Sequence, residues 1–143
     1  MQLTRAADYG VRVLIHLADV ESNTRSSLTD LAEVAEVTPA FLSKVLQRLV
    51  QAGLVASKRG KRGGFALLPS GRTATLLDIL VALDGVPELN RCLVPGTCHR
   101  SSWCAAHPVW QEAQDRMREV LSSITLEQLA AQSRERRIPI VAP

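Results

Sequence analysis

The sequence predicts a mainly α-helical fold with a small β-hairpin wing, arranged as a winged helix-turn-helix and followed by a long C-terminal dimerisation helix. Three observations support this prediction. Two short helical segments meet at a tight turn near Thr38, a glycine-rich hairpin follows over 54–68, and an apolar stripe at helical spacing begins at Pro108. The 143 residues and 46% hydrophobic content suit one compact domain with an appended element.

Capping signals predict the helix-turn-helix. A first helix begins at Thr4, which can cap it, and a second covers 29–36. Thr38 followed by Pro39 is a typical helix start, and Gly53 is a typical helix end. Two short helices joined by a tight turn form the helix-turn-helix pattern.

The hairpin wing is predicted by two short strand-like runs, 54–58 and 65–68, which flank the basic, glycine-rich segment 59–64. Such a segment suits a backbone that turns sharply beside a phosphate chain. A further helix is predicted from Thr75 to Gly85.

The segment 86–107 has no regular apolar period and contains all three cysteines. A long irregular loop in a compact domain normally has a function or is fastened by a bound group. Beyond it, a helix from Pro108 carries apolar residues at alternating spacings of three and four: Trp110, Ala113, Met117, Val120 or Leu121, and Ile124. This stripe is typical of a coiled-coil seam and predicts a homodimer. The alternative is a core helix within one chain. Thr125 and Gln128 fit a capping box for a final short helix.

Charge is unevenly distributed, although the net charge is only +3. No Asp or Glu occurs over 37–77, where seven basic residues fall: Lys44, Arg48, Lys58, Arg59, Lys61, Arg62 and Arg72. A local basic block is typical of a surface that binds a polyanion such as double-stranded DNA. The alternative is a basic face that only contacts solvent.

No export signal or membrane span is expected. The first twenty residues carry Arg5, Asp8, Arg12 and Asp19, so they lack the apolar stretch of a signal peptide. No apolar run approaches the length of a membrane span. The sequence therefore predicts a cytoplasmic protein without a membrane partner. An odd number of cysteines in such a chain favours thiolates used as ligands or redox groups over a disulfide framework. No catalytic set accompanies them, so an enzyme is not expected.

The three cysteines are evenly spaced: five residues separate Cys92 from Cys98, five separate Cys98 from Cys104, and His107 follows three positions later. Thiolates are soft ligands that select iron–sulphur clusters, zinc or copper(I). Wide spacing suits a cluster, whereas structural zinc more often uses closely spaced cysteine pairs. A cluster, a structural zinc ion and a metal-free thiol redox switch all remain open at this point.

Several motifs occur in order along the chain: Met1-Gln2-Leu3-Thr4, Asp8-Tyr9-Gly10, the wing 59–64, the three cysteines and 124–129. Together they resemble the IscR/NsrR/RirA family of bacterial winged-helix regulators, over Met1 to about Ala131. The resemblance implies a homodimeric, cytoplasmic transcriptional regulator, expected to be a repressor, that binds double-stranded promoter operator DNA. It also implies a bound iron–sulphur cluster that senses redox state, nitric oxide, or iron and cluster status.

The resemblance offers two candidates for a fourth ligand beside Cys92, Cys98 and Cys104. In the subfamily of the cluster-assembly regulator, a histidine three positions after the last cysteine holds a [2Fe–2S] cluster, and His107 matches it. In the nitric-oxide-responsive subfamily, an aspartate near the N-terminus of the partner subunit can hold [4Fe–4S], and Asp8 matches it. We favour His107, and therefore [2Fe–2S], because imidazole is an established cluster ligand and its position follows the cysteine loop. The alternative for His107 is a histidine that caps the turn at the start of the following helix, and the alternative for Asp8 is a surface carboxylate in the first helix.

The residues expected to face DNA from the second helix of the motif are Thr38, Ala40, Ser43, Lys44, Gln47 and Arg48. The N-terminal ones can approach base edges in the major groove. Lys44 and Arg48 can reach guanine or phosphate, and Gln47 can pair with adenine.

The wing residues Arg59, Lys61 and Arg62 are expected to neutralise phosphates. By resemblance, Arg59 is the candidate for a narrow minor groove. The alternative is a winged helix that contacts protein, which the absence of carboxylates over 37–77 disfavours. Four parts are therefore predicted: a DNA-binding domain over 1–85, a cluster-binding loop over 86–107, a dimerisation helix with a closing helix over 108–133, and a flexible tail over 134–143.

Overall fold

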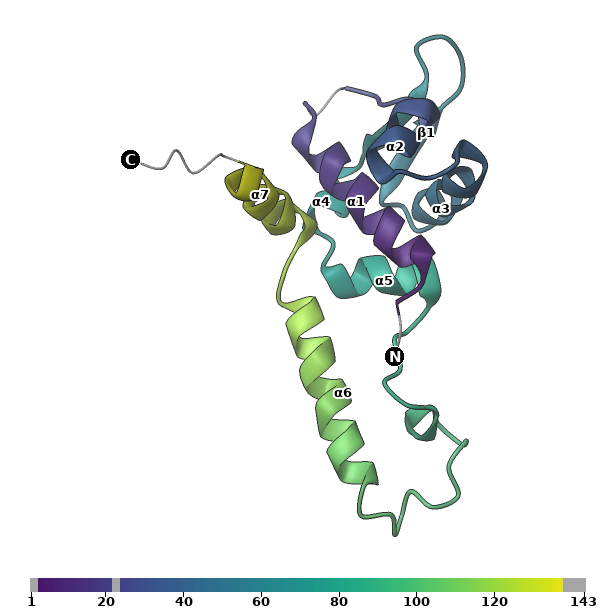
Figure 1. Cartoon of the computed structure of the whole chain (residues 1–143), viewed down its shortest axis with the longest axis vertical. Helices are drawn as coiled ribbons and strands as arrows, with labels where there is room; N and C mark the ends of the chain where they lie inside the picture. Colours follow the sequence, from purple (N-terminus) through teal and green to yellow (C-terminus); the bar gives the residue numbers. More distant parts are fainter. Residues whose placement is uncertain (1–2, 22–23, 138–143) are drawn as a thin grey trace.

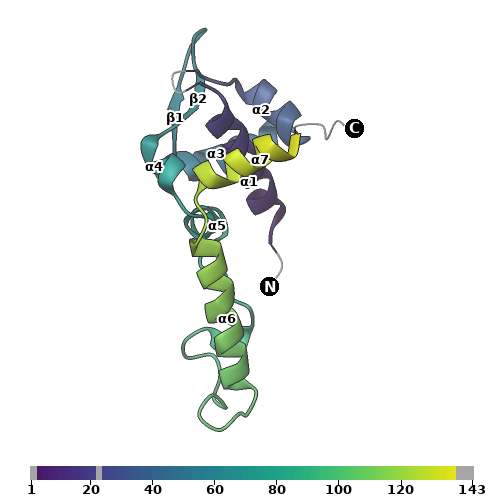
Figure 2. The same cartoon turned by 90° about the vertical axis from the view of Figure 1, so that its left-hand side faces the viewer.

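The computed structural model describes residues 3–21 and 24–137. The elements in chain order are α1 (Arg5–Asp19), α2 (Leu28–Ala35), α3 (Pro39–Gln51), β1 (Val55–Lys58), β2 (Gly64–Leu67), α4 (Pro69–Thr73), α5 (Leu76–Asp84), the 3-10 turn η1 (Arg91–Leu93), α6 (His107–Ser122) and α7 (Leu126–Arg137). They form a head, which holds α1–α5, the hairpin and α7, and a protruding arm, which holds α6 and the loop before it (Figure 1). Figures 1 and 2 both show α6 and the preceding loop extending away from the head. The mainly helical fold with a two-stranded hairpin is as predicted.

The helix-turn-helix forms where the capping signals predicted it. The Thr38 hydroxyl accepts a hydrogen bond from the Phe41 N–H at the start of α3, with Pro39 at the first helical position. Gly53, just beyond α3, has a φ of +71°. The turn between α2 and α3 places Glu36 at φ 57° and ψ 46°, a left-handed conformation that only glycine adopts without strain.

The wing is an antiparallel hairpin in which Val55 pairs with Leu67 and Lys58 pairs with Gly64. Beside the second strand, Ser26 forms an isolated antiparallel bridge with Phe65 through two backbone hydrogen bonds of 2.9 Å. A side chain at Gly64 would place Cβ 2.6 Å from the Ser26 carbonyl oxygen, and its φ is +122°. Glycine at position 64 therefore allows the close approach at the base of the wing.

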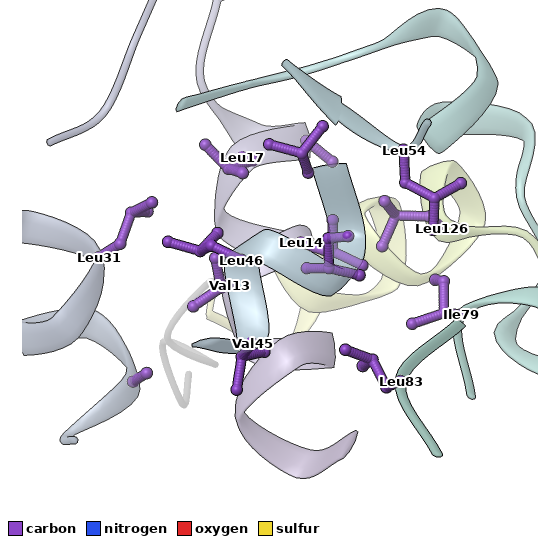
Figure 3. Close-up of a cluster of buried hydrophobic side chains, with 14 of the residues drawn as sticks. Val13, Leu14, Leu17, Leu31, Val45, Leu46, Leu54, Ile79, Leu83 and Leu126 are labelled. Carbon is purple, nitrogen blue, oxygen red and sulfur yellow. The ribbon is translucent and has the colours of Figure 1, made fainter. Parts of the chain in front are cut away.

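The hydrophobic core lies between α1, α2, α3, α5 and α7 (Figure 3). Leu14 of α1 and Leu46 of α3 are fully buried in it, as is Ile79 of α5. The chain returns from the arm to contribute Leu126 and Ala130 of α7, both also buried. The Leu126 N–H donates to the Ala74 carbonyl over 2.9 Å, so the start of α7 is joined to the residues just before α5.

Helix α6 is largely outside the core. Gln114, at 6% exposed, is its one buried residue within the described chain, whereas Trp110 and Val120 are 42% and 67% exposed. The observed burial disfavours the alternative of an intramolecular core helix. The predicted stripe is wrong at its last member: α6 ends at Ser122, so Ile124 lies in the connection, because Thr125 and Gln128 form the predicted capping box and begin α7.

Two further differences concern the ends of elements. The short helix α4, which begins at Pro69, was not predicted. Helix α7 continues to Arg137, beyond the boundary predicted at 133, and Arg134 forms an ion pair of 2.7 Å with Asp19 that ties this turn to α1. The remainder of the predicted tail, 138–143, lies outside the described residues. No helix in the described ranges is both long and apolar enough to cross a membrane.

Candidate DNA interface and cysteine loop

The side of α3 that faces away from the core carries most of the residues predicted to read DNA. Thr38, Ala40, Lys44 and Gln47 are exposed and Ser43 is half-buried. The opposite side of the helix holds the buried Leu42, Val45, Leu46 and Leu49. The predicted set therefore lies on one surface, with the exception of Arg48.

Arg48 is directed toward α5. Its guanidinium Nη1 donates to the Leu83 carbonyl oxygen over 2.6 Å. A cation at the C-terminal end of a helix is stabilised by the unpaired carbonyls there. Arg72 makes a similar contact with the Ala18 carbonyl of α1 at 3.4 Å. Two basic residues of the acid-free stretch, the range 37–77 without Asp or Glu, thus bind carbonyl groups within the fold. A count of charges does not reveal this.

The wing tip presents the other predicted DNA contacts. Arg59, Lys61 and Arg62 are all exposed. Gly60 has a φ of +103°, and the Gly63 N–H donates to the Gly60 carbonyl over 2.8 Å to close the turn. The tip is therefore a tight, glycine-dependent turn that displays three cations.

Arg25 also supports the wing, although the sequence did not point to it. Its guanidinium donates to the Gly64 carbonyl over 3.2 Å at the base of the hairpin. Its position in the polar loop before α2 gave no periodic or capping signal.

The cysteine loop brings together part of the predicted ligand set. Cys92, Cys98 and His107 all line one cavity of about 140 Å³. Cys104 does not line it. Cys104 lies in the turn before α6, where its carbonyl accepts a hydrogen bond from the His107 N–H over 3.1 Å. All three cysteines are free thiols and half-buried.

His107 has an unusual environment for a histidine. Its Nδ1 atom is buried and has no hydrogen-bond partner among the residues that the structure describes. A buried polar atom without a hydrogen-bond partner lowers the stability of a protein by about 1–3 kcal/mol. Such an atom therefore often indicates a bound ion or molecule that supplies the partner. A bound iron would supply one. The donor set of three thiols and an imidazole fits an iron–sulphur cluster chemically. Over the described ranges, however, no three His, Cys, Asp or Glu side chains are close enough to hold one metal ion as they stand.

Asp8 lies apart from this cavity within one chain. It sits on the first turn of α1, exposed, and forms an ion pair of 3.0 Å with Arg12. It lines a separate apolar groove of about 490 Å³ that includes Leu80 and Leu121. A role for Asp8 as a ligand would therefore require a second subunit.

Polar contacts at the base of the loop were not predicted. Arg118 of α6 forms an ion pair of 3.1 Å with Glu88, and the Gln114 side-chain oxygen accepts from the Leu89 N–H over 2.9 Å. These contacts fasten the start of the cysteine loop to α6.

A helix-turn-helix with polar and basic residues on its exposed helix, followed directly by a basic wing, defines a winged-helix DNA-binding regulator. Residues 3–132 match the Rrf2 family, described as "Iron-dependent Transcriptional regulator". The chain belongs to the Rrf2 family. It is therefore a DNA-binding transcriptional regulator and not an enzyme.

Relatives in this family are similar over nearly the whole chain. The HTH-type transcriptional regulator IscR of Cronobacter sakazakii is 31% identical over 132 residues, which cover 90% of this chain and 80% of that protein. The structure of T. potens IscR is 26% identical, with a TM-score of 0.77 over 96% of this chain and 92% of that one. The oxidised form of Staphylococcus aureus CymR is 29% identical, with a TM-score of 0.71 over 91% and 96% of the two chains.

Proposed function

We propose that this regulator is a cytoplasmic homodimeric repressor that senses redox state, nitric oxide, or iron and cluster status through an iron–sulphur cluster. Cys92, Cys98, Cys104 and His107 are its proposed protein ligands. The observation that carries the proposal is the unpaired, buried Nδ1 of His107, a residue that lines one cavity together with Cys92 and Cys98. The iron-dependent description of the family and the resemblance to IscR support the same assignment.

The proposed cluster is [2Fe–2S], with [4Fe–4S] and the Asp8 of the partner subunit as the alternative. When bound, such a cluster supplies a redox-active iron centre that is sensitive to oxidants and nitric oxide. The chain's own residues hold the loop ready for it. Thr97 Oγ1 donates to the carbonyls of Arg91 and Val94, and Ser101 Oγ donates to that of Cys98, so hydrogen bonds already shape the backbone on both sides of Cys98.

The DNA contacts follow from the exposed surface. In our proposal Thr38, Ala40 and Ser43 approach base edges at the start of α3 while Lys44 and Gln47 reach guanine, adenine or phosphate. Arg59, Lys61 and Arg62 of the wing neutralise backbone phosphates, and Arg59 enters the minor groove.

The dimer would form along α6. Val109 and Val120 are 63% and 67% exposed, and the neighbouring Trp110 is 42% exposed, so the helix presents apolar area that the head does not cover. Apolar residues exposed along one helix are typical of a subunit interface.

A second candidate is a metal-free thiol redox switch. Its support is that all three cysteines are free, and that a relative, S. aureus CymR, has been solved in an oxidised form. In that case oxidation would join two of the cysteine thiols, with loss of two protons and two electrons to the oxidant.

Anaerobic purification followed by an absorption spectrum and iron and sulphide counts tests the proposal. We compare the wild type with His107→Ala, and use His99→Ala as the control because His99 is exposed in the same loop. We expect a brown wild-type protein with iron and sulphide, a spectrum that shifts in His107→Ala, and no shift in His99→Ala.

An unchanged spectrum in His107→Ala together with a shift in Asp8→Ala would assign the fourth ligand to Asp8. A colourless protein with zinc, or one that takes up no metal on reconstitution, would contradict the cluster. A reversible mass loss of two hydrogen atoms under oxidant would then identify the thiol switch.

A further inference from the structure

Arg48 occupies an unusual place for a basic residue of a DNA-reading helix. Although Arg48 is exposed, its guanidinium is bound to the Leu83 carbonyl at the last turn of α5, over 2.6 Å. The N–H group is charged and the carbonyl belongs to a helix end, so this is a charge-assisted contact. A guanidinium held in this way joins α3 to α5 directly.

The residues that follow Leu83 are held by two other elements. The Thr4 hydroxyl at the start of α1 donates to the Asp84 carboxylate over 2.7 Å. Arg118 pairs with Glu88, and Gln114 accepts from the Leu89 N–H, both from α6. We refer to residues 83–89 as the α5–loop link.

The α5–loop link includes the start of the cysteine loop, and Cys92 lies three positions beyond Leu89. Gln114, whose side chain accepts a hydrogen bond from the link, is the one buried residue of α6 in the described chain. A displacement of the cysteine loop therefore acts on a segment fastened at one end to α6 and at the other to the exposed helix of the motif.

We infer that Arg48 is a positioning residue, which couples the base of the cysteine loop to α3 through the α5–loop link, and that it is not a DNA contact. The signalling role of this coupling rests on the proposed function. The coupling itself requires no bound cluster, so it can be tested separately.

The dependence of DNA affinity on salt separates the two roles. A side chain that neutralises a phosphate contributes about −0.9 to the slope of log K against log salt concentration. We would measure binding of the full-length, cluster-free protein to a duplex selected from a random-sequence pool by the wild type. Arg48→Met is compared with Lys44→Ala, because Lys44 is an exposed cation one turn earlier on the same helix.

We expect Arg48→Met to weaken binding roughly tenfold at every salt concentration, with the wild-type slope, because a hydrogen bond to a charged group is lost but no phosphate contact is. Lys44→Ala is expected to reduce the slope by about 0.9. A slope reduced by about 0.9 in Arg48→Met would overturn the inference.

Amide hydrogen exchange provides a second readout that reports on the link directly. In the cluster-free protein, Arg48→Met is expected to speed exchange over 83–89, and Lys44→Ala to leave it unchanged. Wild-type exchange over 83–89 in Arg48→Met would contradict the coupling.

Arg48→Lys serves if Arg48→Met does not fold. Lysine retains the charge that a phosphate contact needs but lacks the planar guanidinium. A positioning role predicts the loss of affinity in Arg48→Lys as well, whereas wild-type affinity would show a phosphate contact. None of these results depends on iron. The inference about Arg48 can therefore be contradicted while the proposed cluster is confirmed, and the reverse.

Discussion

At the scale of single residues, Glu36 shows where local strain is stored. It adopts φ 57° and ψ 46° in the turn between α2 and α3, and its N–H donates to the Glu33 carbonyl over 3.1 Å. The tight turn has to redirect the chain between two packed helices, so tertiary packing imposes a conformation that the side chain disfavours.

Replacing Glu36 by glycine is therefore expected to stabilise the protein. Relief of left-handed strain outweighs the added freedom of the unfolded chain, and we expect the free energy of unfolding to rise by about 0.5–1 kcal/mol. Urea denaturation followed by circular dichroism measures it. Glu33→Gly is the control, because Glu33 is exposed within α2, where glycine is expected to destabilise by about 0.5–1 kcal/mol. Destabilisation by Glu36→Gly would contradict the strain.

Residue orientation was also where prediction from sequence was weakest. The acid-free stretch correctly indicated a basic surface, since Lys44, Arg59 and Lys61 are exposed. Arg48 and Arg72 belong to the same stretch but bind helix-end carbonyls in the head. Charge patterning is a property of composition, whereas these contacts depend on which helices meet in space.

At the scale of elements, the signals that lie in a few neighbouring residues predicted structure well. Thr38 with Pro39 and Thr125 with Gln128 marked helix starts because capping is decided within one turn. Helix α7 was predicted to be short and to end at 133, whereas it continues to Arg137. Its docking depends on Leu126 and Ala130 meeting the core and on the ion pair between Arg134 and Asp19.

The wing offers a prediction of its own. Lys61→Ala is expected to weaken DNA binding equally for all sequences and to reduce the salt slope by about 0.9. Arg59→Ala is expected to reduce the slope and also the preference for duplexes with a narrow minor groove. Fluorescence anisotropy with A-tract and mixed-sequence duplexes at several salt concentrations measures both. Equal behaviour of the two variants would refute the minor-groove role of Arg59.

The proposed dimer interface on α6 predicts that a charge placed on its apolar surface weakens the dimer. Val120→Glu would place a charge on its apolar surface, and burial of an unpaired charge is unfavourable, so we expect the dimer to weaken at least roughly tenfold. Sedimentation equilibrium measures this. Gln111→Glu, another exposed position on α6, is the control and is expected to remain dimeric. A monomeric wild type, or a Val120→Glu variant that dimerises normally, would contradict an α6 interface.

At the scale of the whole molecule, the arm is joined to the head at both of its ends: by the α5–loop link where the chain leaves the head, and by α7 where the chain returns to it. The spacing of the cysteines predicted a ligand loop, and Cys92, Cys98 and His107 do meet at one cavity. Spacing could not predict that Cys104 lies outside it, because the loop has no regular period and Cys104 lies in the turn before α6, where its carbonyl accepts from the His107 N–H.

The central claim is that the state of the cysteine loop controls DNA binding. Its most direct test compares DNA affinity of cluster-loaded and cluster-free protein on the selected duplex at one salt concentration, under anaerobic conditions. We predict that the affinities differ by at least about fivefold, the lower end of typical allosteric coupling. Equal affinity and equal sequence preference of the two forms would contradict the account.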